Sequence, residues 1–192
     1  DLIPDRVQRN FEHLERRNMT GGWRKLGNFS IGSTSLNYSS IPQTFTHLKV
    51  IFVMQSNRAS YANTGGLIRI NGSNLGVYSR SGYYVATTSG GPNKGSFGDR
   101  AAYGWYIGQI PAGTRGTDDM VTTGEALFPF YRRAGVVRTY TAISGGDDGT
   151  NVLGFTGSGA YMSGTAAISS LMFCDDVAGN LGPRAFAELW AA

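Results

Sequence analysis

The sequence has few of the residues that build catalytic and metal sites. Its 192 residues include one cysteine, two histidines and only 16% charged residues. Cys174 cannot form a disulfide within the chain, and the apolar run around it predicts a buried thiol. His13 and His47 lie far apart, and no nucleophile-elbow sequence accompanies them, so neither a zinc site nor a Ser-His-Asp triad is indicated. We therefore expect a protein that is not an enzyme and that binds no metal or cofactor.

The 13 acidic residues also lack the spacing of a known site. Asp147-Asp148 and Asp175-Asp176 supply oxygen ligands, but neither pair has the alternating spacing and final glutamate of a calcium loop. Nothing in the sequence marks two carboxylates as the pair that cleaves a glycosidic bond. A carbohydrate-active enzyme is therefore kept only as a lesser alternative.

Positive charge and long apolar runs are both limited. The net charge is +4, and the arginines are scattered along the chain rather than clustered as a nucleic-acid surface requires. The longest apolar run, Leu48–Met54, is far shorter than the roughly 20 residues that cross a bilayer. We expect neither nucleic-acid binding nor membrane insertion.

Glycine and aromatic residues are abundant, and they favour short strands joined by turns. The chain contains 28 glycines, 10 tyrosines and 10 phenylalanines. Leu48–Met54 is rich in β-branched and aromatic residues, which predicts a central strand covered on both faces. A polar loop with Arg58 follows. Arg58 is predicted to be structural, pairing with a carboxylate or holding loop carbonyls, and ligand binding is kept as the lesser alternative. After the alternating residues 67–70, Asn71-Gly72 predicts the tight turn of a β-hairpin.

Segments with strand-like alternation recur at fairly even spacing along the rest of the chain. They suggest eight to ten short strands, which predict an all-β, antiparallel two-sheet sandwich of jelly-roll type. The interval 79–99, rich in Gly, Ser and Thr, is predicted to be a long surface excursion with one short strand. Tyr83 and Tyr84 within it are candidate ligand-binding residues, although packing at a sheet edge explains them equally well. Asp147 and Asp148, in the loop 144–151, are the other candidates.

The first 19 residues differ from the rest of the chain. Val7, Phe11 and Leu14 recur at helical spacing among charged residues, which predicts one short amphipathic helix. Such a short helix needs a partner for its apolar stripe. Either copies of the same helix in an oligomer or the helix's own domain could supply that partner. We therefore divide the chain into a helix over 1–19, for oligomerisation or attachment, and a sandwich domain over 20–192.

Several short motifs resemble those of a known family. The shared pieces are Trp23, Ile41-Pro42, Leu48-Lys49-Val50, Arg58-Ala59, Asn71-Gly72, Tyr78 and Ala167-Ile168-Ser169-Ser170-Leu171. In these positions the chain resembles the jelly-roll domains of tail-fibre, receptor-binding and decoration proteins of tailed bacteriophages. It departs from their pattern near the end, where Gly182-Pro183 and Leu189-Trp190 replace the usual Gly-Ser and Leu-Tyr-Gly. All the matching positions belong to the scaffold, so they do not identify a binding site.

The resemblance implies a virion structural protein that is assembled in the host cytoplasm and exposed on the particle. It implies a homotrimer in which an N-terminal helix leads into a distal β-domain. Two roles fit this picture. The domain either contacts a host-surface saccharide as part of a tail fibre or receptor-binding protein, or binds other virion proteins as a capsid decoration or fibre protein.

Overall fold

The computed structural model describes residues 22–31, 34–57, 63–73, 76–88, 91–111, 120–147, 152–176, 181–182 and 184–192. The predicted N-terminal helix with Val7, Phe11 and Leu14 lies outside these residues, as do Arg58 and Asp148. The described part of the chain is all β, and it contains no helix long and apolar enough to cross a membrane.

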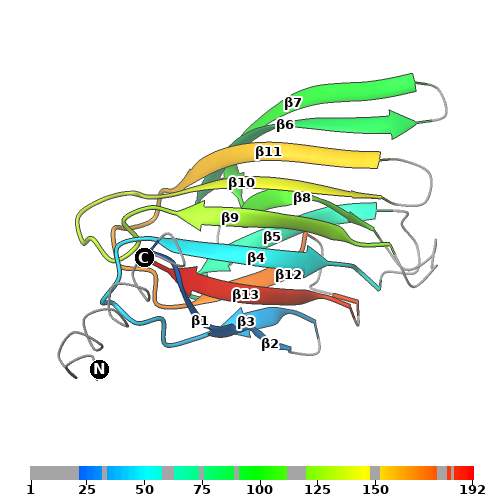
Figure 1. Ribbon diagram of the computed structural model, residues 1–192. Helices are drawn as coiled ribbons and strands as arrows, with labels where there is room; N and C mark the ends of the chain where they lie inside the picture. The colour runs from blue at the N-terminus through cyan, green and yellow to red at the C-terminus, as the bar shows by residue number, and fades with distance from the viewer. Residues whose placement is uncertain are drawn as a thin grey trace, which may run out of the picture.

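Two antiparallel sheets make up the fold, as predicted (Figure 1). The larger sheet has eight strands in the order β1 (Arg24–Asn28), β13 (Phe186–Ala191), β4 (Leu48–Met54), β9 (Thr122–Phe128), β10 (Arg138–Asp147), β11 (Val152–Tyr161), β6 (Tyr78–Thr88) and β7 (Gly91–Ala102). The smaller has five, in the order β2 (Ser30–Ile31), β3 (Leu36–Tyr38), β12 (Leu171–Asp175), β5 (Asn63–Ile70) and β8 (Trp105–Pro111). Sheet edges therefore lie at β1, β7, β2 and β8.

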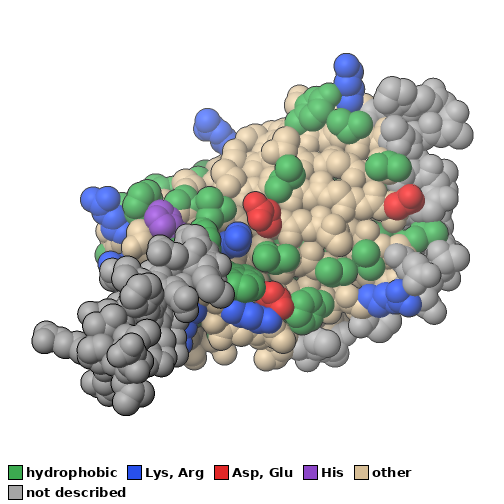
Figure 2. Space-filling model, in the orientation of Figure 1, with side chains coloured by type: hydrophobic (Ala, Val, Ile, Leu, Met, Phe, Trp, Pro, Cys, Tyr) green, Lys and Arg blue, Asp and Glu red, His purple; other side chains and the backbone are tan. Residues whose placement is uncertain are grey.

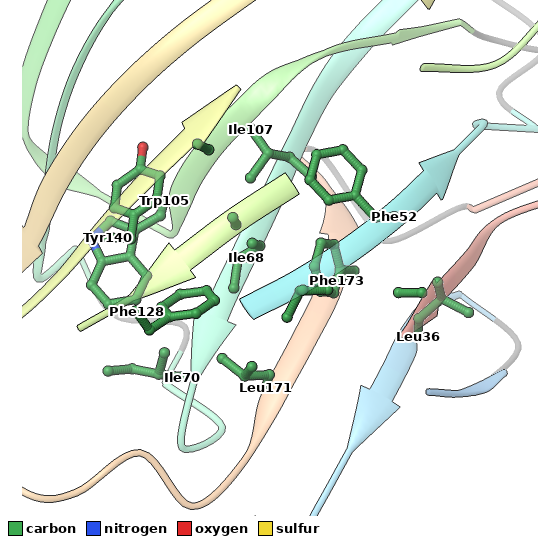
Figure 3. Close-up of a cluster of buried hydrophobic side chains, with 14 of the residues drawn as sticks. Leu36, Phe52, Ile68, Ile70, Trp105, Ile107, Phe128, Tyr140, Leu171 and Phe173 are labelled. Atoms are coloured by element: carbon green, nitrogen blue, oxygen red, sulfur yellow. The ribbon is translucent and has the colours of Figure 1, made fainter. Parts of the chain in front are cut away.

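Aromatic side chains join the two sheets through the core (Figure 3). Phe52 on β4 meets Phe173 on β12, with ring centroids 5.7 Å apart. Trp105 on β8 stacks on Tyr140 of β10 at 4.9 Å. Offset and edge-on contacts of this kind add to the free energy gained from burying the rings. The core thus holds the sheets face to face along most of their length.

Strand β4 is central in its sheet, but only one of its faces is covered. Leu48, Val50, Phe52 and Met54 are buried, whereas Ile51 on the other face is 40% exposed. The prediction of a strand covered on both faces was therefore wrong. The apolar run reflects strong β propensity at outward positions as well as burial at inward ones.

Asn71-Gly72 forms a tight turn, but that turn does not close a β-hairpin. Both residues have positive φ (52° and 69°), and the Ser73 amide donates to the Ile70 carbonyl at 2.9 Å. The chain then leaves the smaller sheet, because β5 belongs to that sheet and β6 to the larger one. The turn residues agree with the prediction, and the pairing of the flanking strands does not.

The Asn71 side chain fastens this turn to a segment about 100 residues away in sequence. Its Oδ1 accepts hydrogen bonds from the Ser169 and Ser170 amides at 2.7 and 3.3 Å, and its Nδ2 donates to the Ala167 carbonyl at 2.9 Å. Asn71 therefore replaces the missing backbone partners of the irregular chain that leads into β12.

Tyr78 fixes the other side of the turn and makes stability sensitive to alkaline pH. Its buried hydroxyl accepts from the Ile70 amide at 3.0 Å and donates to the Ser73 carbonyl at 3.1 Å. Burial raises the pKa of Tyr78 from 10.0 to about 12. The unfolded chain releases this proton near pH 10, so above that pH it binds fewer protons than the folded chain. Stability that is fully present below pH 10 is therefore lost as pH rises toward 12, by roughly 2–3 kcal/mol.

Urea unfolding between pH 9 and pH 12 measures this loss. Tyr78→Phe is expected to cost about 1 kcal/mol at pH 7, through its lost hydrogen bonds, and to reduce the alkaline loss. Part of the loss of stability with rising pH is expected to remain in that variant, because burial also raises the pKa values of Tyr106 and Tyr140. An identical pH dependence in both proteins would contradict the assignment to Tyr78.

The interval 79–99 is where the predicted strands differ most from the structure. It does not form a loop with one short strand, but belongs to the long hairpin of β6 and β7. The chain also bends at Tyr103-Gly104 between β7 and β8, and Thr34 and Ser35, between β2 and β3, belong to no strand. Pro129 follows the end of β9, an internal strand that lies between β4 and β10.

Candidate functional site

The β6–β7 hairpin widens the larger sheet beyond β8, the edge strand of the smaller sheet. Its inner face is therefore only partly covered, and a cleft of about 420 Å³ lies between the hairpin and β8. This volume is in the range of small-molecule sites. The residues lining the cleft are Arg80, Tyr84, Phe97, Gly98, Asp99, Tyr106 and Gln109.

Strand alternation decides which side chains reach the cleft. Arg80 and Tyr84 lie on the inner face of β6, with Phe97 and Asp99 on the same face of β7. Arg80 is directly opposite Asp99 in the ladder. Tyr83, one residue from Tyr84, therefore points to the other face of the sheet, where it is 42% exposed. The two candidate tyrosines thus belong to different surfaces.

Phe97 and Tyr106 form one wall of the cleft, and the buried ring of Phe155 packs against both of them. Tyr106 meets Phe97 edge-on at 5.2 Å and Phe155 edge-on at 5.1 Å, while Phe97 and Phe155 stack at 6.0 Å. A glycine makes room for them, because a Cβ at Gly82 would lie 2.7 Å from Phe155 and 3.1 Å from Phe97. The rings are consequently held in place by the sheet rather than by a loop.

Tyr84 is oriented in a similar way by a glycine on the neighbouring strand. It is opposite Gly95 in the ladder, and a Cβ at Gly95 would lie 2.7 Å from the Tyr84 hydroxyl oxygen. The phenol ring therefore lies across the Gly95 backbone. Tyr84 remains half-buried, so part of its ring faces solvent at the cleft.

The polar groups of the cleft centre on Arg80. Its Nη2 lies 3.3 Å from Oδ2 of Asp99, and its guanidinium carbon lies 5.6 Å from the centroid of the Tyr106 ring. The buried Nε of Arg80 has no hydrogen-bond partner among the described residues. Burial raises the pKa of Tyr106 far above its usual value, with the charge of Asp176 adding to the effect.

Hydroxyl groups of the larger sheet hold β8 against the cleft. A free strand edge has unpaired carbonyls, and here side chains from β9 and β10 satisfy them. The Tyr140 hydroxyl donates to the Tyr106 carbonyl at 2.8 Å, Ser144 to Ile107 at 2.6 Å and Thr122 to Gln109 at 2.7 Å. These bonds fix the two β8 residues that line the cleft, Tyr106 and Gln109.

Gly108, between those carbonyls, is expected to tolerate no side chain. Its φ is +115°, and a Cβ there would lie 2.3 Å from Oγ of Ser144. Gly108→Ala is expected to lower the free energy of unfolding by roughly 2–3 kcal/mol, since it adds backbone strain to a steric clash. Gly164→Ala is the matched control, because nothing lies within 4 Å of its Cβ position. Equal urea midpoints for the two variants would contradict the constraint at Gly108.

Of the three predicted ligand-binding residues that the structure describes, the cleft contains Tyr84 alone. Asp147 is exposed at the end of β10, where its Cα pairs with Val152 of β11. Asp148 lies outside the described residues. Sequence patterns did not mark Arg80, Phe97, Asp99, Tyr106 or Gln109 as site residues. Because side chains alternate along a strand, the sequence could have placed Tyr84 on the same face as Arg80. That β8 lies close to this face depends on the fold as a whole.

The described residues contain no group of three His, Cys, Asp or Glu side chains placed to hold a metal ion. Comparison with known proteins adds no further assignment: no family model, no curated protein sequence and no solved structure matches the chain.

Proposed function

We propose that the chain is a non-enzymatic attachment module of a tailed-phage virion, a jelly-roll domain that binds host-surface saccharide in the cleft beside β8. The observation that carries this proposal is the cleft itself. Half-exposed aromatic rings lie there beside a carboxylate, a guanidinium and an amide. Sugars have apolar C–H faces and polar rims, so a site of this composition suits them.

The arrangement of acids in the cleft favours binding over cleavage. Glycoside hydrolysis needs two carboxyl groups at a defined separation on either side of the scissile bond. Among the described residues that line the cleft, Asp99 is the one carboxylate, and it forms an ion pair with Arg80. This arrangement supports a lectin-like role over that of a carbohydrate-active enzyme.

The connections between strands support the jelly-roll assignment. The chain passes from one sheet to the other between β3 and β4, between β4 and β5 and between β5 and β6. It crosses again on either side of β8 and of β12. Frequent crossing between two antiparallel sheets is typical of Greek-key and jelly-roll folds. The virion setting and the homotrimer rest on the family resemblance and on the stripe Val7, Phe11 and Leu14.

One surface feature favours the second candidate, a decoration or fibre protein that binds other virion proteins. The outer face of the larger sheet exposes apolar side chains across several strands (Figure 2). They include Ile51, Tyr83, Ile143, Val152 and Phe186, each at least 40% exposed. An exposed face with this much apolar area is a common feature of protein contacts.

Labelled full-length protein tested on a panel of bacterial strains and their isolated envelope polysaccharides distinguishes the two roles. Attachment predicts binding to at least one strain, lost in Tyr84→Ala and kept in Tyr83→Ala, because those two residues point to opposite faces. Binding to no envelope, with the protein located on the capsid by electron microscopy, would reject attachment in favour of decoration. Deleting residues 1–17 tests the trimer separately: unchanged association would exclude the helix as the assembly element.

A further inference from the structure

We infer that the cleft beside β8 selects a neutral pyranose, and that Asp99 excludes sugars that carry a carboxylate, phosphate or sulfate. This inference rests on the proposed saccharide-binding function and specifies the class of saccharide. The geometry that points to it is the pairing of Arg80 with Asp99 beside half-exposed aromatic rings.

The aromatic wall fits the apolar face of a sugar ring. Tyr84, Phe97 and Tyr106 are all half-buried, so each leaves part of its ring open to the cleft. The axial C–H groups of a pyranose form a flat apolar patch of similar size to a six-membered aromatic ring. The glycines at positions 82 and 95 leave room for Phe97 and Tyr84 to pack against the sheet. Rings already packed in this way before a ligand arrives lose little conformational entropy on binding.

The polar groups match a pair of neighbouring hydroxyls. A sugar hydroxyl both donates and accepts, and the cleft offers an acceptor in Asp99, donors in Arg80 and both kinds of group in Gln109.

Charge explains why the ligand is neutral. A cleft that binds an acidic sugar needs a cation free to pair with it. Here the guanidinium of Arg80 is engaged by Asp99 at 3.3 Å and lies over Tyr106, and Asp176 adds a second negative charge close enough to act on Tyr106. An anionic ligand would compete with Asp99 for Arg80 and be repelled by both carboxylates. A neutral sugar leaves the ion pair intact.

The test uses affinity electrophoresis and calorimetry of the full-length protein at physiological ionic strength. The probes are neutral polysaccharides (dextran, mannan, galactomannan) and acidic ones (alginate, polygalacturonate, heparin). The wild-type protein is expected to bind at least one neutral probe and none of the acidic ones. Tyr84→Ala is expected to weaken that binding at least tenfold, whereas Tyr83→Ala, on the opposite face, changes it less than twofold.

Asp99→Asn provides the sharper test, because it keeps the shape of the side chain and frees the charge of Arg80. This variant is expected to lose at least tenfold in affinity for the neutral probe and to gain binding to an acidic one, which weakens as salt rises. Circular dichroism confirms that each variant is folded.

Wild-type binding to acidic probes, or neutral binding that survives Tyr84→Ala, overturns the inference. So does an Asp99→Asn variant with unchanged selectivity. These results leave the attachment role standing if the protein still binds cells. Conversely, the protein could be located on the capsid and still bind neutral polysaccharides selectively through Tyr84. That result would reject the attachment role and leave the inference in place.

Discussion

Replacing Arg138 with methionine is expected to lower the free energy of unfolding by roughly 3–5 kcal/mol. The Arg138 side chain is only 1% exposed, on the inner face of β10. Its Nε donates to the Ala166 carbonyl at 2.7 Å, Nη1 to Phe130 at 3.0 Å and Nη2 to Thr165 at 2.6 Å. Methionine keeps most of the aliphatic volume but removes all three charge-assisted hydrogen bonds.

The expected loss is large because Arg138 holds two irregular segments at once. Phe130 is in the turn after β9, and Thr165 and Ala166 precede β12 in a stretch without regular hydrogen bonding. Burial lowers the pKa of the Arg138 guanidinium, yet an arginine remains charged throughout the neutral range. Without the side chain, both segments lose their attachment to the sheet.

Urea unfolding at pH 7 measures the effect, with Arg132→Met as the matched control. Arg132 is exposed, and its contacts with the carbonyls of Gln43 and Thr44 are long, at 3.4 and 3.5 Å. The control is therefore expected to lose less than about 0.5 kcal/mol. A similar loss in both variants would show that Arg138 is not an anchor.

The sequence could predict that some arginine holds loop carbonyls, but not that Arg138 does so. That role was predicted for Arg58, which follows an apolar strand and lies outside the described residues. Arg138 stands in an alternating strand beside Thr139, where a charged side chain is normally expected to face solvent. Its buried position depends on carbonyls that come from two distant parts of the chain. No local pattern contains that information.

Strands with regular alternation and β-branched residues were predictable, and glycine-rich ones were not. Leu48–Met54 was predicted at the bounds that the structure has. The β6–β7 hairpin was predicted as a loop, since glycine disfavours strands. In the structure the glycines at positions 82 and 95 are required there, because aromatic rings of neighbouring strands occupy the space a side chain would fill. Cross-strand packing thus reverses the local preference.

The candidate site was predictable only in part, for a related reason. Tyr84 was a candidate ligand-binding residue because it lies in a segment rich in Gly, Ser and Thr. The other residues of the cleft lie largely on β7 and β8. The cleft exists because the larger sheet extends past the edge of the smaller one, and that depends on strand order. Strand order is a property of the whole chain, so spacing within one segment cannot supply it.

Phe52→Ala is expected to destabilise the protein by roughly 3–5 kcal/mol, and Ile51→Ala by less than about 1 kcal/mol. Phe52 is 1% exposed and packs against Phe173 of the other sheet, with its Cζ also close to Gly124. Truncation would leave a cavity that the rigid sheets cannot close. Ile51, the preceding residue, points outward beside Glu125 and Glu188 and is 40% exposed.

This pair tests whether the outer face of the larger sheet is free in the isolated protein. Both residues lie on β4, so backbone and strand propensity contribute similarly to the two losses of stability. The difference between the losses therefore measures how deeply each face of the strand is buried. If Ile51→Ala cost as much as Phe52→Ala, the outer face would be buried in solution. Repeating both measurements over a hundredfold range of protein concentration identifies the cause: a loss in Ile51→Ala that grows with concentration would assign that burial to association between copies, since only association responds to mass action.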